Sequence, residues 1–253
     1  MIVKTNAIVL RARNLRETSK FLTMYTESFG KLTVVAKGVR QLKSRLSGVV
    51  EPFNIISVVL YKKENRDVHY LSSAEIIEPM WRLTTEFNAC ATALAVAELL
   101  DMTMHDEERN QEMFTLLAET FRNLALPGSS PAAAFVRFQI RLISIMGYGL
   151  DIHLCARCRK PLANETRVYF RGESGNALCA ACESASGFGT KLSPAAYKLL
   201  TAQQTRGADE RPNEKTIEYA ELSELERMLN SYIAQHCENK RRQYATALMS
   251  KRQ

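Results

Sequence analysis

The stretch FLTMYTESFGKLTVVA, residues 21–36, decides how the first third of the chain folds. It contains two runs rich in β-branched and aromatic residues, 21–26 and 32–36, on either side of the turn-like segment Ser28-Phe29-Gly30-Lys31. Short runs of this composition, bounded by turn residues, are typical of β-strands. The stretch therefore predicts two consecutive strands joined by a tight connection.

Three further runs of the same kind surround this pair, at residues 7–10, 55–61 and 68–71. Five short strands within residues 1–80 favour a small closed barrel over an open sheet, because closure removes exposed edges. A five-stranded barrel with excess positive charge is the architecture of the OB fold, which often binds single-stranded nucleic acid. The sequence predicts an OB-type nucleic-acid-binding domain over residues 1–80.

Beyond Pro79 the apolar residues recur at helical spacing, so residues 81–253 are predicted to form a helical domain and the fold class is α+β. Thr84 or Thr85 is expected to cap a helix with apolar residues at 87, 90, 91, 94 and 97, and a second helix covers residues 113–124. Ser130 followed by Pro131 predicts another helix start, and Gly147 a left-handed end. Ser193-Pro194 repeats the start signal, and a last apolar stripe runs from residue 222 to 236.

Four of the six cysteines form two Cys-x-x-Cys pairs, Cys155 with Cys158 and Cys179 with Cys182. Each pair brings two thiolates to one ion from a single turn, and two such turns complete a tetrahedral shell. The strand-like segment 167–171 and the turn-like segment 173–176 between them are typical of a ribbon. Two unrelated buried or redox-active pairs are the alternative. In a reducing compartment the spacing favours one structural Zn²⁺, in a module at about residues 150–190 inserted in the helical domain.

Positive charge is concentrated at the start of the chain. The net charge is +7, yet residues 1–50 contain ten basic and two acidic residues, which leaves 24 basic and 25 acidic residues for the rest. A basic segment on a nearly neutral remainder indicates contact with a polyanion, although a solvated basic face without a ligand is the alternative. The candidate phosphate-binding residues are Lys37, Arg40, Lys43 and Arg45, with Arg11, Arg13 and Arg16 on the same side.

Other functional classes find little support. The longest stretch without a charge, residues 123–136, is too short to span a bilayer, and the N-terminus does not resemble a signal peptide, so a cytoplasmic protein is expected. The chain lacks phosphate-binding-loop and dinucleotide-binding glycine motifs. His105-Asp106-Glu107 followed by Cys155 and Cys158 resembles the halves of a zinc deaminase motif, but Leu154 replaces the expected proline and the second cysteine pair would have no role. The sequence favours a binding protein, not an enzyme.

Taken together, several segments resemble the bacterial RecO family of recombination mediators. They are Arg16-Glu17-Thr18-Ser19, Ala36-Lys37-Gly38-Val39-Arg40, Ser44-Arg45, Glu51-Pro52-Phe53, residues 138–142, Met146-Gly147-Tyr148 and the two cysteine pairs. The resemblance covers nearly the whole chain in the right order. It departs from the pattern at Arg159, where a glycine often follows the first cysteine pair, and in the segment 238–244 near the C-terminus.

The resemblance implies a DNA repair protein, associated with the nucleoid, that binds single- and double-stranded DNA and anneals complementary strands without a nucleotide cofactor. It also implies that RecR and single-stranded-DNA-binding protein are partners during recombinase loading. Arg137 and Arg141, four residues apart beside Phe138 and Leu142, are candidates for contact with an acidic, apolar-tipped peptide of such a partner, although they are more often arginines whose stems pack on the core.

Two other functions remain open from the sequence. A zinc-ribbon RNA-binding or transcription-associated adaptor would use the same basic barrel but prefer structured RNA. A protein–protein scaffold would show no salt-sensitive binding to either polymer.

Overall fold

The computed structural model describes residues 1–63, 66–185, 187, 189–205 and 218–236. Residues 237–253, the end of the predicted helical domain, lie outside the described residues. The chain divides into two compact units, of which the first contains Met1–Ser129 and the second Ser130–Lys240. Three helices that follow the barrel strands therefore belong to the same compact unit as the barrel.

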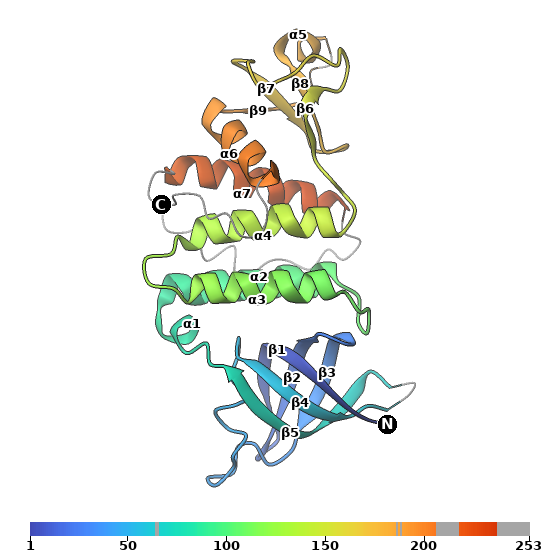
Figure 1. The fold of residues 1–253 in the computed structure, drawn as a ribbon, viewed down its shortest axis with the longest axis vertical. Helices are drawn as coiled ribbons and strands as arrows, with labels where there is room; N and C mark the ends of the chain where they lie inside the picture. The colour runs from blue at the N-terminus through green and yellow to red at the C-terminus, as the bar shows by residue number, and fades with distance from the viewer. Residues whose placement is uncertain (64–65, 186, 188, 206–217, 237–253) are drawn as a thin grey trace. The chain divides into compact units, whose positions relative to one another are not determined.

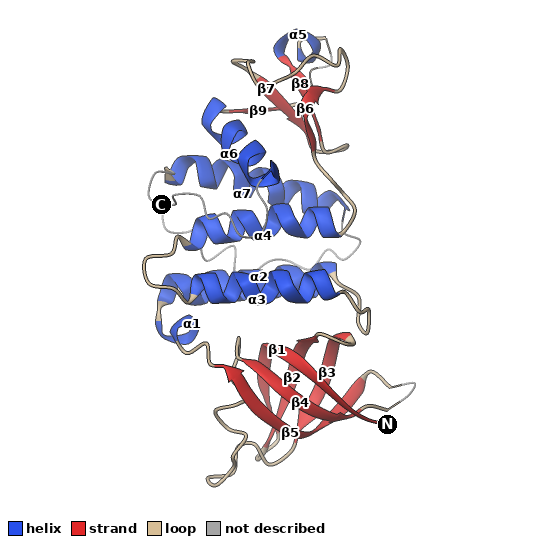
Figure 2. Cartoon of the chain, in the orientation of Figure 1, coloured by secondary structure: helices blue, strands red, loops and turns tan. Residues whose placement is uncertain are grey.

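The first unit begins with a closed five-stranded barrel, as predicted (Figures 1 and 2). Its strands are β1 (Ile2–Leu15), β2 (Ser19–Thr26), β3 (Gly30–Ala36), β4 (Ile55–Tyr61) and β5 (Val68–Glu78). The order around the barrel is β1-β2-β3-β5-β4. Neighbouring strands pair antiparallel except β3 and β5, whose parallel pairing closes the sheet.

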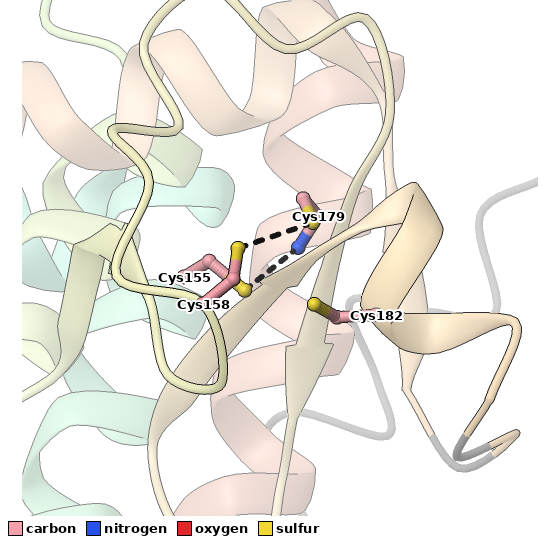
Figure 3. Close-up of side chains that lie close together, drawn as sticks. All are labelled: Cys155, Cys158, Cys179 and Cys182. Atoms are coloured by element: carbon pink, nitrogen blue, oxygen red, sulfur yellow. Dashed lines mark hydrogen bonds between the residues drawn. The ribbon is translucent and has the colours of Figure 1, made fainter.

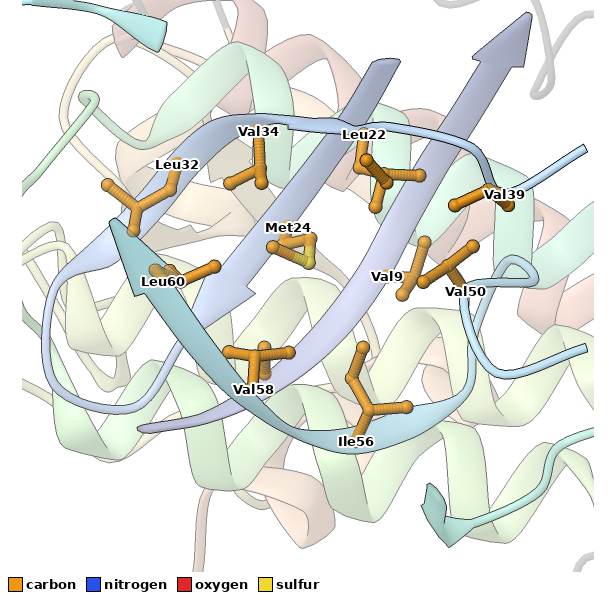
Figure 4. Close-up of a cluster of buried hydrophobic side chains, with 12 residues drawn as sticks. Val9, Leu22, Met24, Leu32, Val34, Val39, Val50, Ile56, Val58 and Leu60 are labelled. Atoms are coloured by element: carbon orange, nitrogen blue, oxygen red, sulfur yellow. The ribbon is translucent and has the colours of Figure 1, made fainter. Parts of the chain in front are cut away.

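Alternating side chains of these strands fill the barrel interior (Figure 4). The fully buried cluster includes Leu22 and Met24 of β2, Val34 of β3, and Val58 and Leu60 of β4. Each such side chain contributes about 1.5–3 kcal/mol when it is removed from water. Because side chains alternate along a strand, the residues between these positions point out of the barrel.

β1 and β5 are longer than their apolar runs suggested. β1 continues from residue 10 to Leu15, and β5 continues from residue 71 to Glu78. The added parts carry exposed polar side chains, among them Arg11, Arg13 and Glu75, which point out of a barrel whose interior face is already apolar. Composition alone does not reveal such half-polar strand ends.

The helices of the first unit are α1 (Arg82–Thr85), α2 (Phe87–Thr103) and α3 (Gln111–Leu124). The prediction that Thr84 or Thr85 caps the helix at Phe87 is wrong. Both threonines lie inside the single turn of α1, where their hydroxyl groups donate to the carbonyl oxygens of Trp81 and Arg82. The residue that precedes α2 is Glu86, whose side chain makes no capping hydrogen bond.

The connection between α2 and α3 is fastened to the barrel. Lys31 of β3 places its Nζ 3.0 Å from an Asp101 carboxylate oxygen and 3.1 Å from one of Asp106. The fully buried ring of His69 on β5 lies 2.9 Å from the carboxylate of Glu107. Two residues of the deaminase-like triplet, Asp106 and Glu107, thus bind side chains of the barrel and hold the helices to it, while the third, His105, is exposed.

In the second unit, α4 (Pro131–Ile145), α6 (Pro194–Thr205) and α7 (Tyr219–His236) pack against one another. The predicted start of α4 is confirmed, since the Ser130 side chain accepts a hydrogen bond from the Ala133 N–H and Pro131 occupies the first turn. Ser193 caps α6 in the same way through the Ala196 N–H. Gly147, at φ 83°, has the predicted left-handed conformation just beyond α4.

A small four-stranded sheet completes the second unit. Its strands are β6 (Asp151–Cys155), β7 (Val168–Arg171), β8 (Asn176–Cys179) and β9 (Thr190–Leu192), in the order β6-β8-β7-β9, with the single-turn helix α5 (Ala180–Glu183) after β8. The Tyr197 hydroxyl of α6 donates to the Ile152 carbonyl oxygen at 3.0 Å, so the sheet is joined to the helices of its unit. Across the described residues, every helix is too short or too polar to cross a bilayer.

Candidate metal centre and nucleic-acid interface

The four cysteines of the two Cys-x-x-Cys pairs meet at one end of the small sheet (Figure 3). Cys155 ends β6 and Cys158 lies in the turn that follows, while Cys179 ends β8 and Cys182 lies in α5. The parallel pairing of β6 with β8 places Cys155 opposite Ala177. Residues more than twenty positions apart in the sequence therefore converge because their two strands are neighbours.

The four Sγ atoms all lie within 4.8 Å of one another. Cys158 Sγ is 3.8 Å from Cys179 Sγ, and the Cys179 N–H donates to Cys155 Sγ at 3.5 Å. Cys155 and Cys179 are buried, Cys182 is half-buried and Cys158 is exposed. The predicted ligand set is thus assembled at one point and can hold a metal ion.

The electrostatics of the cluster favour thiolates at part of the site. Burial alone raises the pKa of the Cys155 thiol, but the backbone N–H groups of Cys158, Cys179 and Arg157 outweigh it and lower this pKa to about 6. The pKa of Cys182 is raised to about 12, because its neighbouring sulfurs stabilise the protonated form. Thiolate is the form that binds a metal ion, and a cation among the four sulfurs opposes the repulsion between them.

The turn after the first cysteine pair has a conformation that suits glycine. Arg159 lies at φ 59°, in the left-handed region, and its N–H donates to the Cys155 carbonyl oxygen at 2.8 Å. A left-handed conformation costs a non-glycine residue about 1–2 kcal/mol. The family resemblance leads us to expect glycine at this position, and the left-handed backbone explains that preference. In this chain Arg159 adopts the left-handed conformation instead.

The seven predicted phosphate-binding residues are all exposed on the barrel unit. Arg11 and Arg13 lie on β1, Arg16 lies in the turn between β1 and β2, and the other four follow β3: Lys37, Arg40, Lys43 and Arg45. Among the described residues, none of the seven forms an ion pair with a carboxylate. Lys20, Lys31 and Lys62 of the same unit do form such pairs, with Glu51, with two aspartates and with Glu107 respectively.

The segment after β3 is tied to the β1–β2 turn by Arg40. The Arg40 backbone N–H donates to the Thr18 carbonyl oxygen at 2.9 Å, and its Nη1 donates to the carbonyl oxygens of Arg16 and Glu17, each at 3.0 Å. These bonds hold the backbone at Arg16 close to Arg40, so residues from two loops lie side by side. One guanidinium nitrogen of Arg40 thereby has a structural role.

The aromatic residues of the barrel unit differ in whether a base could stack on them. Phe53 is 1% exposed and packs edge-to-face on Phe121 with ring centroids 5.3 Å apart, so it is a core residue and not a stacking surface. Tyr61 is 48% exposed. Tyr70, which sequence reasoning missed, has the ammonium groups of Lys37 and Lys63 at 4.9 and 5.1 Å from its ring centroid. The signal for it was its place in the predicted strand 68–71, one residue after His69.

The candidate partner-binding arginines lie on α4 of the second unit. Arg137 and Arg141 are both half-buried, while Phe138 and Leu142 are fully buried. The phenylalanine and leucine side chains therefore belong to the core of this unit. The contact of the arginines with a partner stays a prediction.

Comparison with known proteins places the whole chain in one family. Residues 1–80 match the family described as "Recombination protein O N terminal", and residues 84–245 match "Recombination protein O C terminal". Similar curated proteins include the DNA repair protein RecO of Chloroherpeton thalassium, 31% identical over 245 residues that cover 94% of each chain. Those of Prosthecochloris aestuarii and Thermoanaerobacter sp. are 28% and 25% identical, each over 94% of this chain and 93% of the relative.

Proposed function

Because the chain belongs to the recombination protein O family, we propose that it is a DNA repair protein that binds single- and double-stranded DNA and anneals complementary strands. The proposal is supported by the full-length similarity to relatives that are named DNA repair proteins. It is supported separately by the barrel, whose architecture recurs in proteins that bind oligonucleotides.

One observation carries the proposal: among the described residues of the barrel unit, basic residues that join its elements are paired with carboxylates, and the predicted phosphate-binding residues are not. Those that join strands or helices to one another are paired with carboxylates, as Lys20 is with Glu51 and Lys31 is with Asp101. The seven on β1, the β1–β2 turn and the segment after β3 are exposed and, within the described part of the chain, unpaired with carboxylates. Phosphate groups would supply the missing negative charge, and the release of their counterions would drive binding.

Strand annealing requires no reacting side chain. A cationic surface that binds two strands reduces the repulsion between their phosphates and raises the rate of encounter, and base pairing supplies the free energy. We therefore propose a binding protein and not an enzyme. Annealing by the full chain should proceed equally with and without ATP.

The proposal extends to partners. During recombinase loading, the protein would act with RecR on strands covered by single-stranded-DNA-binding protein. Arg137 and Arg141 on α4 are proposed to receive acidic side chains of such a partner, since their positions four residues apart place them on one side of the helix. With Phe138 and Leu142 in the core, the contact would be mainly electrostatic.

The cysteine cluster is proposed to hold one structural Zn²⁺. In a tetrahedral shell with Zn–S bonds of about 2.3 Å, neighbouring sulfurs lie about 3.8 Å apart. The separation of Cys158 Sγ from Cys179 Sγ, 3.8 Å, fits that shell. Four sulfur ligands leave no position for water, so the ion would stabilise the small sheet and would take no part in catalysis.

The test is a salt titration of the affinity for single-stranded DNA, duplex DNA and RNA. The variant combines Lys37→Ala, Lys43→Ala and Arg45→Ala, and it keeps Arg40 because that side chain fastens the loop. Each phosphate contact on a single strand contributes about −0.7 to the slope of log affinity against log salt, so the variant should bind more weakly with a slope shallower by about 2.

A matched control removes three exposed cations from the second unit, namely Lys191, Lys198 and Arg227. The control changes the net charge equally, so it should keep the wild-type slope. An unchanged slope in the barrel variant would place the DNA contact elsewhere. A preference for structured RNA over single-stranded DNA would contradict the DNA repair role and favour the RNA-binding alternative.

A further inference from the structure

The barrel register aligns a row of residues that are far apart in the sequence. Arg13 of β1 pairs with Phe21 of β2, Phe21 pairs with Val35 of β3, Val35 pairs with Tyr70 of β5, and Tyr70 pairs with Tyr61 of β4. Cross-strand partners point to the same side of a sheet. The five side chains therefore form one continuous row across all five strands.

This row lies on the outside of the barrel. Leu22, Val34 and Leu60 point into the interior cluster, and each is the chain neighbour of one member of the row (Figure 4). Alternation along the strands turns Phe21, Val35 and Tyr61 outward. Phe21 and Tyr70 are half-buried and Tyr61 is 48% exposed, so three aromatic rings are accessible along a row that curves with the barrel.

Three cations accompany these rings. The guanidinium carbon of Arg13 lies 5.7 Å from the Phe21 ring centroid, and the ammonium groups of Lys37 and Lys63 lie 4.9 and 5.1 Å from that of Tyr70. These distances fall within the range of cation–π attraction, which orients the side chains without neutralising their charge. In the described residues none of the three pairs with a carboxylate.

We propose that this row, called here the aromatic track (Arg13, Phe21, Val35, Tyr70 and Tyr61, with Lys37 and Lys63 beside it), binds a single strand through its unpaired bases. Bases stack on Phe21, Tyr70 and Tyr61, and the neighbouring cations contact the phosphates that link them. Along the curved sheet the backbones at Phe21 and Tyr70 lie two strand spacings apart, about 10 Å, and their outward side chains diverge further, so the rings meet different nucleotides. The proposal rests on the proposed function and adds recognition of the bases to the grip on phosphates.

The chemistry of the track distinguishes single strands from duplexes. A base in a duplex is already stacked between its neighbours and cannot place its face on a protein ring, whereas an unpaired base can. Stacking on an aromatic side chain tolerates any sequence, because every base has a π-face. The track therefore selects single strands without reading their sequence, while the basic loop after β3 contacts phosphates of either form.

The test compares two strands with the same phosphates. One is an oligothymidine of about 16 nucleotides, and the other has the same length but lacks the bases in its central half. The wild-type chain should bind the complete strand about tenfold more tightly, which corresponds to about 1.4 kcal/mol of stacking. Tyr70→Leu combined with Phe21→Leu should reduce this preference to about twofold or less, while Tyr70→Phe, which keeps the ring, should retain it.

Three measurements distinguish stacking on the track from a general loss of affinity or of folding. Trp81→Leu removes an exposed aromatic residue that lies outside the track and should leave the preference unchanged. The variants should keep the wild-type salt slope, since they remove no charge, and urea unfolding should confirm that each is folded. If the wild-type chain bound both strands equally and binding stayed salt-sensitive, base stacking on the track would be refuted, while phosphate binding by the basic residues would stand. Salt-insensitive or undetectable binding to both strands would refute the proposed function as well.

Discussion

Gly30→Ala should destabilise the barrel unit because the glycine lies directly against the connection between α2 and α3. Gly30 begins β3 at φ 65°, and a Cβ at this position would lie 1.9 Å from the Glu108 carbonyl oxygen. Contacts below about 3.0 Å are not found at real Cβ atoms, and here the opposing atom is backbone. The connection must therefore move away from β3.

The structure shows what that movement would break. The Glu107 N–H donates to the Lys31 carbonyl oxygen at 2.9 Å, and loss of this bond costs about 1 kcal/mol. The ring of His69, fully buried, would lose the Glu107 carboxylate at 2.9 Å, which costs a further 1–3 kcal/mol or so. The left-handed backbone conformation adds about 1–2 kcal/mol for alanine. We expect the free energy of unfolding to fall by about 4 kcal/mol.

Urea denaturation of the full chain measures this change, followed by far-ultraviolet circular dichroism and by the fluorescence of Trp81, the single tryptophan, which lies in the barrel unit. Gly48→Ala is the matched control, because a Cβ there meets nothing within 4 Å, and its effect should stay within about 0.5 kcal/mol. A loss below about 1 kcal/mol for Gly30→Ala would show that the connection is not anchored on β3 as described.

Two other predictions concern the metal centre and a surface ion pair. A strong chelator should release one equivalent of zinc and unfold the small sheet, and Cys158→Ser should weaken metal retention. A colorimetric assay measures the zinc and circular dichroism measures the loss of structure. A fully folded metal-free protein would contradict a structural ion. The Arg122 guanidinium, which is hydrogen-bonded to Glu78, lowers the pKa of that carboxyl group. The pair therefore stabilises the fold above the unfolded-state pKa of about 4.3, and this stabilisation is lost as the pH falls through the lower pKa of the folded state. Because both side chains are more than a third exposed, Glu78→Gln should lower the free energy of unfolding by only about 0.5 kcal/mol at pH 7 and by nothing near pH 2. Urea unfolding at the two pH values measures this, and an equal loss at both would exclude an ionic origin.

Local sequence patterns predicted the elements of this fold well where one segment contains the whole signal. Ser130-Pro131 and Gly147 define the limits of α4 through bonds and dihedral angles within a few residues of themselves. The failure at Thr84 and Thr85 has an equally local cause. Their hydroxyl groups turn back to carbonyl oxygens of Trp81 and Arg82, and capping residues are recognised from sequence only when no such competing partner is near.

The metal site was predictable from local sequence signals, whereas the pairing that closes the barrel was not. Each Cys-x-x-Cys pair is a local signal, and two pairs at ribbon spacing predicted a ligand set that the structure then brought within 4.8 Å. The closure of the barrel by β3 and β5 is different, because their parallel pairing joins residues 33–35 to residues 68–70 across a long connection. No periodicity within either strand specifies that partner.

The aromatic track follows from that closure, and for this reason no pattern within a single strand predicts it. Phe53 follows the basic loop in the chain, yet its ring packs on Phe121 in the core, whereas Tyr61 is exposed. Phe21 and Tyr70 are 49 positions apart in the sequence and become neighbours in one row only because both pair with Val35. Substitutions at consecutive positions would therefore fall on both the inner and the outer face of the barrel. Only substitutions at residues paired across the strands can separate base stacking from phosphate binding by the basic loop.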